Sequence, residues 1–364
     1  MHRYRTAIIG LGRIASTIDD EVQGNPAVML PYSHMACYAA VPEIEVVAGA
    51  DPYDEQREDF RRRWGVEHLY ADYREMLEKE RPEIVSVATS AKPRPGIVAD
   101  CAKAGVRLIF AEKPLAFSLA ETDAMIAVCR EHGVKLAVGC TRRWDPYWSV
   151  AHDLIESGAI GQVLQVNGYG NAAISHNGSH LIDLVRFLAG GNVEWVVGEM
   201  ESDEKAHADD DLKGNGYLAF DNGVRAFVRT WPSGAAEWNF EVIGETGRLR
   251  SVGNGSEIEW WQIAPHEGWG NIVRRPFPRP QRIQSPGVRA VYDFITCLET
   301  DKQPTCSGED GRAALEVAIG LRESHRRGHC RVDLPLADRS LAIHSAETLA
   351  GDQPAIMRRR AAAQ

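Results

Sequence analysis

The stretch Thr6-Ala-Ile-Ile-Gly-Leu-Gly-Arg-Ile-Ala15 decides the fold of the first part of the chain. Its first residues form a short apolar run, which is typical of a buried parallel strand. The run leads into Gly10-x-Gly-x-x-Ala15, where Gly10 permits a tight turn and Gly12 lets the backbone approach a pyrophosphate. Ala15 keeps the following helix close to the strand. The pattern therefore predicts a dinucleotide-binding turn between a strand and a helix.

An acidic residue, Asp51, follows the second predicted strand at 44–50. It lies farther from the glycines than the usual ~20 residues, because a loop-like segment with Gly24, Pro26 and Pro31 is inserted at 18–32. We expect the Asp51 carboxylate to bind the adenosine ribose, which favours NAD over NADP since a carboxylate repels a 2′-phosphate. The alternative is that Asp51 caps the helix expected from Glu55 onward, and one residue could do both.

Strand and helix patterns alternate through the first 140 residues, with further strands expected at 84–89, 108–111 and 135–139. Such alternation predicts an α/β domain with a doubly wound parallel sheet and right-handed crossovers. After Cys140 the pattern changes to strands with hairpin turns, interrupted by a helix at 178–188, which predicts an α+β domain with a largely antiparallel sheet. We therefore expect a dinucleotide-binding domain over 1–140, a second domain over 141–337 and a tail over 338–364.

Two ionisable residues, Glu112 and Lys113, stand at the end of the apolar run 108–111, directly before Pro114. In an open α/β sheet, ligands bind beyond the carboxyl ends of the strands, and a proline restricts the backbone of the residue before it. Lys113 is therefore placed to reach a bound ligand. The alternative is a solvated lysine paired with Glu112, and these residues alone do not decide between the two.

A second polar cluster, Ser175-His-Asn-Gly-Ser-His-Leu-Ile-Asp183, begins the helix expected at 178–188. A neutral His180 could act as a general base, because its unperturbed pKa lies near 6.5. The spacing of His176, His180 and Asp183 is also compatible with a metal site, although no further ligand pattern supports one. A purely structural histidine is a third interpretation.

Polar and aromatic side chains lie just past the domain junction, at Arg142, Arg143, Trp144 and Tyr147. Guanidinium forks and flat aromatic faces suit a polyol or an acidic sugar. The alternative is that these residues close an ordinary structural turn.

Composition excludes several classes of protein. The net charge of −10 argues against a nucleic-acid partner. No apolar run approaches the ~20 residues of a membrane span, and the N-terminus shows no signal-peptide pattern. The seven cysteines are scattered without a C-x-x-C pair, which favours reduced thiols over disulfides or zinc. We expect a cytoplasmic protein with no metal.

Several motifs together resemble the glucose–fructose oxidoreductase / inositol dehydrogenase (Gfo/Idh/MocA) family. They are Gly10-x-Gly-x-x-Ala15, Ala111-Glu-Lys-Pro-Leu-Ala116, Arg142-Arg-Trp-Asp-Pro146, Gly178-Ser-His-Leu-Ile-Asp183, Ser307-Gly-Glu-Asp-Gly311 and Val332-Asp-Leu-Pro335. The resemblance covers residues 4 to 337. It implies a Rossmann domain, a C-terminal domain with a large open sheet, a nicotinamide cofactor, and sugars, cyclitols or their derivatives as substrates.

The resemblance also places the family's functional residues on this chain. Its Glu-Lys-Pro lysine falls on Lys113, and its helix histidine falls on His180. His176 stands where the family often has an aspartate, four residues before that histidine. We therefore expect two imidazoles, those of His176 and His180, to share the general-base role. Arg94 stands where the family often has a histidine, and the insertion at 18–32 lies outside the simplest pattern.

We therefore expect an NAD-dependent dehydrogenase that oxidises a hydroxyl of a sugar, cyclitol or sugar derivative. His180, with His176, takes the hydroxyl proton, and Lys113 stabilises the developing alkoxide charge. Cofactor contacts are expected from Gly10, Gly12, Arg13, Ile14, Ala15, Asp51, Thr89, Glu112 and Lys113. Substrate contacts are expected from Lys113, Arg142, Arg143, Trp144, His176, His180 and Asp183.

Two rival functions remain. One is a redox-neutral enzyme that oxidises a sugar transiently to permit elimination or bond cleavage, and the other is a non-catalytic, cofactor-bound sensor. The open sheet of the second domain needs cover on its outer face, which predicts a homodimer or homotetramer. The alternating residues Val224, Ala226 and Val228 suggest the face available for this assembly.

Overall fold

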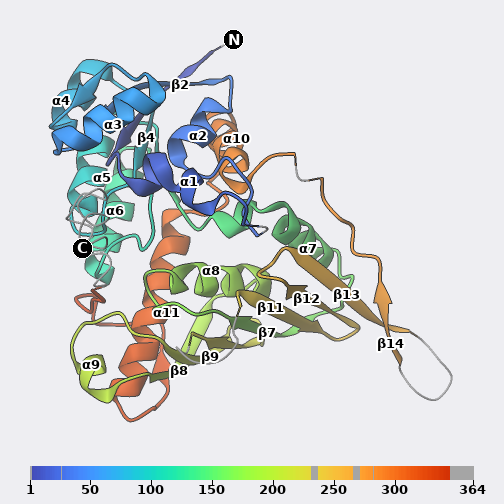
Figure 1. The fold of residues 1–364 in the computed structure, drawn as a ribbon. Coiled ribbons are helices and arrows are strands. Elements are labelled where there is room, and N and C mark those ends of the chain that lie inside the picture. The colour runs from blue at the N-terminus through green and yellow to red at the C-terminus, as the bar shows by residue number, and fades with distance from the viewer. Residues whose placement is uncertain (1, 26, 231–236, 265–270, 282, 345–364) are drawn as a thin grey trace, which may run out of the picture. The chain divides into compact units, whose positions relative to one another are not determined.

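The computed structural model describes residues 2–25, 27–230, 237–264, 271–281 and 283–344 (Figure 1). The chain divides into two compact units, which are described separately below. The first contains Met1–Thr141 and Gln284–Arg312, and the second contains Arg142–Ile283 and Ala313–Ser345. The boundary predicted at residue 140 lies beside Thr141, but residues 284–312 return to the first unit. The predicted tail over 338–364 falls outside the described residues from 345 onward.

The first unit is built on a parallel sheet whose order, among the described residues, is β3-β2-β1-β4-β5-β6. This is the doubly wound order expected for two mononucleotide-binding halves. The strands β4 and β5 are buried along their whole length, as their apolar runs predict. The strands are β1 (Tyr4–Ile9), β2 (Ile44–Ala50), β3 (Leu69–Tyr70), β4 (Ile84–Val87), β5 (Leu108–Ala111) and β6 (Lys135–Val138).

Helices connect these strands, and the sequence marks where several of them begin. Asp72 accepts a hydrogen bond from the N–H of Arg74 at the start of α4, and Ser118 forms a capping box with Glu121 at the start of α6. The helices α5 and α6 pack side by side, and α10 packs on α2. The bounds are α1 (Ile18–Val22), α2 (His34–Ala39), α3 (Asp54–Trp64), α4 (Tyr73–Glu80), α5 (Arg94–Lys103), α6 (Leu119–Glu131) and α10 (Pro286–Thr300).

The loop predicted at 18–32 begins later in the structure than its composition indicates. A π-helical turn at Arg13–Thr17 runs directly into α1, so the chain stays helical as far as Val22. The Asp19 carboxylate then accepts hydrogen bonds from the N–H groups of Tyr32 (2.8 Å) and Ser33 (3.0 Å), which closes the loop onto the start of α2.

The second unit is built on a wide sheet with the order β14-β13-β12-β11-β7-β10-β9-β8-β15 among the described residues. Its described pairs are antiparallel except β7 with β10. The short strands β14 and β15 were not predicted from the sequence. The bounds are β7 (Val163–Tyr169), β8 (Val193–Met200), β9 (Gly214–Phe220), β10 (Arg225–Arg229), β11 (Asn239–Gly244), β12 (Gly247–Val252), β13 (Glu257–Ala264), β14 (Asn271–Arg275) and β15 (Val332–Asp333).

Helices cover one face of this sheet closely because glycines line it. A Cβ at Gly168 of β7 would lie 2.9 Å from Val185 of α8, and one at Gly198 of β8 would lie 2.2 Å from the carbonyl of Leu321 in α11. The helices of this unit are α7 (Pro146–Glu156), α8 (Gly178–Ala189), α9 (Asp203–His207) and the part of α11 (Gly308–Arg326) from Ala313 onward.

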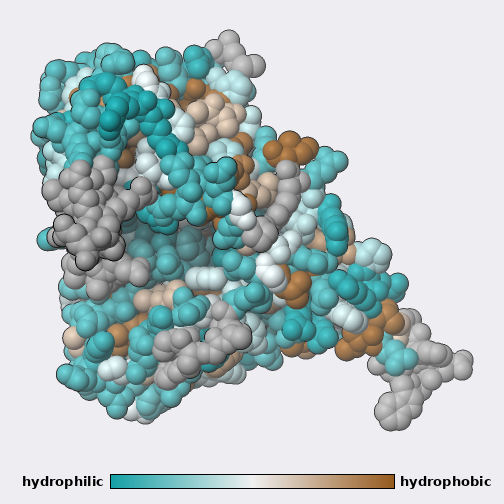
Figure 2. All heavy atoms as spheres, viewed as in Figure 1, coloured by the Kyte–Doolittle hydropathy of each residue, from teal (hydrophilic) through white to brown (hydrophobic). Residues whose placement is uncertain are grey.

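The expectation about the exposed face of the sheet is wrong. Val224, Ala226 and Val228 are buried, on the side that the helices cover. The residues between them point the other way: Phe227 is 38 % exposed, and its partner across the ladder, Tyr217, is 40 % exposed. Hydrophobic side chains also reach the surface at the β13–β14 end, where Ile263 and Ile272 are exposed (Figure 2). Within the described part of the chain, the more exposed face of the sheet is therefore the one that carries Phe227.

Candidate functional site

The glycine turn after β1 has the geometry that the sequence predicts. Gly10 has a φ of +86°, and a Cβ there would lie 3.0 Å from the backbone nitrogen of Thr89. Both the left-handed conformation and the close approach require glycine. A Cβ at Gly12 would meet nothing within 4 Å, so the space beside this turn is open. Ala15 is fully buried, Ile14 is half-buried, and exposed Arg13 pairs with Glu21 at 2.6 Å.

Asp51 lies at the carboxyl end of β2 with its side chain fixed beside the glycine turn. One carboxylate oxygen accepts from the N–H of Leu11 (2.9 Å) and the other from the N–H of Tyr53 (3.0 Å). Burial raises the pKa of Asp51, and the two backbone hydrogen bonds oppose that effect. Helix α3 has Tyr53 as its N-cap residue. The alternative in which Asp51 caps this helix is therefore wrong.

Lys113 follows the buried strand β5, and the preceding Glu112 holds its backbone. The carboxylate of Glu112 accepts from the N–H of Lys113 at 3.2 Å and pairs with Nε2 of His34 at 3.0 Å. Burial raises the pKa of Glu112, but the His34 hydrogen bond and the charges of His34, Lys113 and Arg94 outweigh it and bring the pKa to about 2. Glu112 is thus a buried anion rather than a solvated counter-ion of Lys113.

The polar contacts of Glu112 extend within the first unit through residues that the sequence pattern did not indicate. His34 begins α2, and its Nδ1 lies 3.1 Å from the hydroxyl of Ser86 on β4, which also bonds the hydroxyl of Tyr38 at 2.7 Å. The imidazole of His34 stacks on Phe110, with the ring centroids 4.7 Å apart. The one sequence signal for this network was the acidic residue at the end of a buried strand, because a buried carboxylate needs partners.

Arg94, the first residue of α5, is also part of this region. It is 2 % exposed, and its guanidinium donates to the backbone carbonyls of Thr89 and Pro114, and to that of Leu115 at 3.3 Å. Burial lowers the pKa of Arg94 to about 10. The arginine therefore joins the segment after β4 to the segment that follows Lys113.

In the second unit, the loop before α8 is held by a carboxylate from another part of the chain. The oxygens of Asp211 accept from the N–H groups of Ser175 (2.8 Å) and His176 (2.7 Å). Asn177 occupies the N-cap position of α8, without a side-chain capping bond. His176 and His180 are both half-buried. An acidic residue distant in sequence therefore orders the segment in which the family often carries its own aspartate.

Asp183 and Arg143 form a buried ion pair within the second unit. Nε and Nη2 of Arg143 donate to the two oxygens of Asp183 at 2.9 and 2.8 Å. Trp144 is buried as well. These contacts favour the structural interpretation for Arg143, Trp144 and Asp183 over direct substrate contact. Arg142 instead stacks its guanidinium on Trp238 at 5.1 Å.

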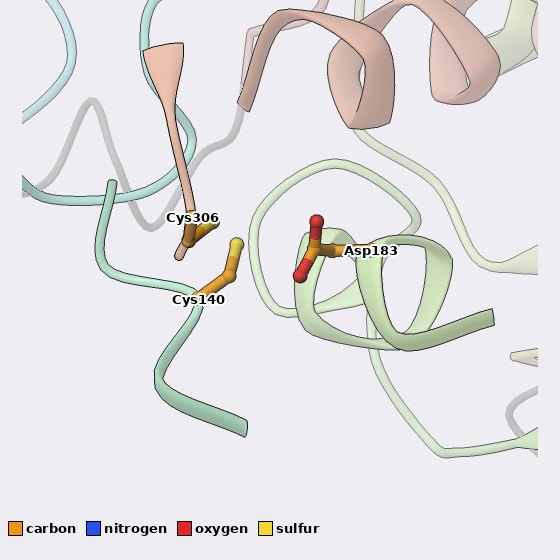
Figure 3. A group of neighbouring side chains, drawn as sticks. All are labelled: Cys140, Asp183 and Cys306. Atoms are coloured by element: carbon orange, nitrogen blue, oxygen red, sulfur yellow. The ribbon is translucent and has the colours of Figure 1, made fainter. Parts of the chain in front are cut away.

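The described residues place no metal-ligand group at His176 and His180. Figure 3 draws Cys140 and Cys306, two thiols that lie close together, and Asp183. Cys140 and Cys306 belong to the first unit, with their sulfur atoms within 4.8 Å of each other, whereas Asp183 belongs to the second and its oxygens are bonded by Arg143. Two thiols fall short of the four ligands of a structural zinc site.

The fold and the glycine turn define a dinucleotide-binding protein with an added α/β domain. A model described as an oxidoreductase family with an NAD-binding Rossmann fold matches residues 4–140, and a model of that family's C-terminal alpha/beta domain matches residues 166–334. The chain belongs to the Gfo/Idh/MocA family of oxidoreductases. Among the described residues, no helix is both long and apolar enough to cross a membrane.

Characterised proteins resemble this chain over most of its length. A scyllo-inositol 2-dehydrogenase (NAD(+)) of Bacillus subtilis is 27% identical over 350 residues, which covers 90% of this chain and 95% of the relative. A D-apiose dehydrogenase of Paraburkholderia graminis is 27% identical over 327 residues, covering 81% and 85%. The structure of an aldose-aldose oxidoreductase from Caulobacter crescentus, complexed with glycerol, shares the fold with a TM-score of 0.73 at 21% identity, covering 92% of this chain and 100% of that one.

Proposed function

We propose that this oxidoreductase is an NAD-dependent dehydrogenase that oxidises a hydroxyl of a sugar, a cyclitol or a derivative of one. One observation carries the proposal: the sheet order β2-β1-β4-β5 brings four carboxyl strand ends together in one unit. They carry, in that order, Asp51, the glycine turn, Thr89 and Lys113. The residues that we propose for the cofactor, and Lys113, therefore follow strands along one edge of the sheet, where ligands bind in sheets of this kind.

The residues of the first unit fit a dinucleotide. The open space beside Gly12 suits a pyrophosphate, and Asp51 suits a ribose. We assign the cofactor contacts to this turn, including Arg13, Ile14 and Ala15, and to Asp51 and Thr89. Glu112 contributes indirectly, because its carboxylate accepts a hydrogen bond from the backbone N–H of Lys113. When NAD is bound, its nicotinamide ring accepts a hydride.

The chain's own side chains carry out the remaining chemistry. Lys113 donates a hydrogen bond to the hydroxyl oxygen that is oxidised and stabilises the negative charge that develops on it. His180 accepts the hydroxyl proton as the general base, and His176, four residues earlier in the sequence, supplies a second imidazole. Arg142, stacked on an indole ring, offers a guanidinium to the substrate's oxygens.

A substrate screen tests the proposal. We expect the purified enzyme with added NAD to form NADH, followed by its absorbance, with at least one member of a panel that contains inositols, pentoses, hexoses and anhydrosugars. A panel without any NADH formation, by an enzyme shown to bind NAD, would contradict the proposal and leave the redox-neutral enzyme and the sensor as the two alternatives.

The cofactor preference is a second prediction. We expect calorimetric titration to give tighter binding of NAD than of NADP, because the fixed Asp51 carboxylate repels a 2′-phosphate. Asp51→Asn removes the charge while keeping an oxygen that can accept from the N–H of Leu11. It should therefore reduce the difference in affinity between NAD and NADP while the turn stays intact. Asp72→Asn, at the cap of α4, is the matched control. Tighter binding of NADP by the wild-type protein would refute the assignment.

The third prediction concerns assembly. We propose a homodimer or homotetramer built on the sheet face that carries Tyr217 and Phe227, since these aromatic side chains are exposed on it. Light scattering at micromolar concentration should give a multiple of the chain mass, and Phe227→Lys should lower it. Arg225→Lys, on the same face, should leave it unchanged. A monomeric wild-type protein would rule the proposal out.

A further inference from the structure

Arg94 is a buried charge whose hydrogen bonds all go to backbone carbonyls in the contacts described above. Its side chain ranks among the large fully buried ones of the first unit, at 2 % exposure. A buried guanidinium is costly unless its donors are satisfied. Here both Nη atoms of Arg94 are bonded, whereas its Nε has no partner among the described atoms. Its acceptors are the carbonyls of Thr89, Pro114 and Leu115, and the negative charge of Glu112 acts on it as well.

These acceptors flank the reactive lysine. Pro114 and Leu115 are the two residues that follow Lys113, and Thr89 lies against Gly10 of the glycine turn. On the other side, the carboxylate of Glu112 accepts from the N–H of Lys113 itself and is fixed by His34. A Cβ at Gly139 would lie 2.8 Å from this carboxylate, so Glu112 has little room to move. The backbone of Lys113 is thus held on both sides by buried ions.

The chemistry of the guanidinium explains why arginine suits this position. It presents five N–H donors in a planar, rigid fork, which can reach carbonyls on two separate segments at once. A lysine ammonium is a point charge on a flexible stem, and a neutral imidazole has a single N–H donor. Neither can replace the set of bonds that joins the segment after β4 to the segment after β5.

We propose that Arg94 is a positioning residue that fixes the Lys113 turn, and thereby sets where the Lys113 ammonium meets the substrate oxygen. We call the hydrogen bonds of Arg94 to Thr89, Pro114 and Leu115 the clamp. The inference rests on the proposed function for its catalytic consequence, but the effect of the clamp on the Lys113 turn can be measured without any substrate. Misplacing a catalytic group by about 1 Å can cost about 10²-fold in rate.

Hydrogen–deuterium exchange of the holoenzyme, with NADH added, tests the clamp. Arg94→Met should speed amide exchange in peptides covering 112–118, whereas Arg107→Met, which removes an exposed arginine paired with Glu83, should not. Unchanged exchange over 112–118 in Arg94→Met would overturn the proposal. This readout stands even if the wild-type enzyme turns over no member of the sugar panel, in which case the proposed function fails and the clamp does not.

A double-mutant cycle with Lys113 tests the catalytic consequence on the panel sugar that the wild-type enzyme oxidises fastest. Arg94→Met and the milder Arg94→Lys should each lower kcat by about 10- to 100-fold, with KM changed much less. In a Lys113→Met background, Arg94→Met should cost at most about twofold more, because the residue it positions is gone. Multiplicative losses would show that Arg94 supports the fold in general and would overturn the positioning role.

Free guanidinium ion supplies a further readout. Adding guanidinium ion to Arg94→Gly should raise the kcat of this variant by about tenfold or more. The ion can occupy the vacated space and bond the same carbonyls. A melting temperature close to wild type in Arg94→Lys keeps the comparison meaningful if Arg94→Met folds poorly. No gain in kcat with guanidinium, in a folded Arg94→Gly enzyme, would count against the clamp.

Discussion

Lys113→Met should lower kcat by about 10²- to 10³-fold, because it removes the donor that stabilises the developing alkoxide. His180→Ala should lower kcat by about 10²- to 10⁴-fold, the usual effect of losing a general base. Since the two side chains serve the same proton and charge transfer, the double variant should be far less impaired than the product of the single losses. Steady-state kinetics on the best panel sugar measures all three.

Controls separate these losses from damage to the fold. Lys103→Met, at the end of α5, and His207→Ala, at the end of α9, change the same residue types at exposed positions and should leave kcat unchanged. NAD affinity should also change little in Lys113→Met and His180→Ala, because the pyrophosphate and the ribose are assigned to other residues. Full turnover by Lys113→Met would end the proposed mechanism and leave the cofactor site in place.

Asp183→Asn should destabilise the protein by about 3–5 kcal/mol, the usual cost of breaking a buried ion pair from one side. The Asp183 side chain is 1% exposed and that of Arg143 is 9% exposed, so the guanidinium would stay buried without its countercharge. Urea unfolding measures this change. The variant enzyme that remains folded should keep its turnover, since both Asp183 oxygens bond Arg143 rather than a substrate.

A matched control for this prediction lies in the same unit. Asp333 of β15 pairs with Arg331 at an exposed position, and exposed pairs contribute little to stability. Asp333→Asn should therefore shift the urea midpoint only slightly. A stable Asp183→Asn enzyme that has lost turnover would instead support the substrate contact that the sequence pattern suggested for Asp183.

The parts of the structure that follow local rules could be predicted from the sequence. Gly10 requires a left-handed backbone, Ser118 and Glu121 form their capping box, and the apolar run 108–111 becomes a buried strand. Each of these depends on residues a few positions apart. Their chemistry therefore determines the local structure largely without help from the rest of the fold.

The features that depend on distant residues could not be predicted. The partner of Glu112 is His34, and the carboxylate that orders the loop at His176 is Asp211. Both pairs form only after the sheets assemble, and neither spacing is periodic. The sheet face shows a related limit: alternation at 224–228 separates two faces, but which face the helices cover depends on the glycines of neighbouring strands.

The most direct test of the proposed dehydrogenase is the stoichiometry of one reaction. The enzyme is incubated with excess NAD and its best panel sugar, and NADH and the sugar product are measured together by absorbance and mass spectrometry. A simple dehydrogenase releases one NADH for each sugar that loses two hydrogens, and we expect this result. Conversion of the sugar without net NADH would contradict the account and establish the redox-neutral alternative.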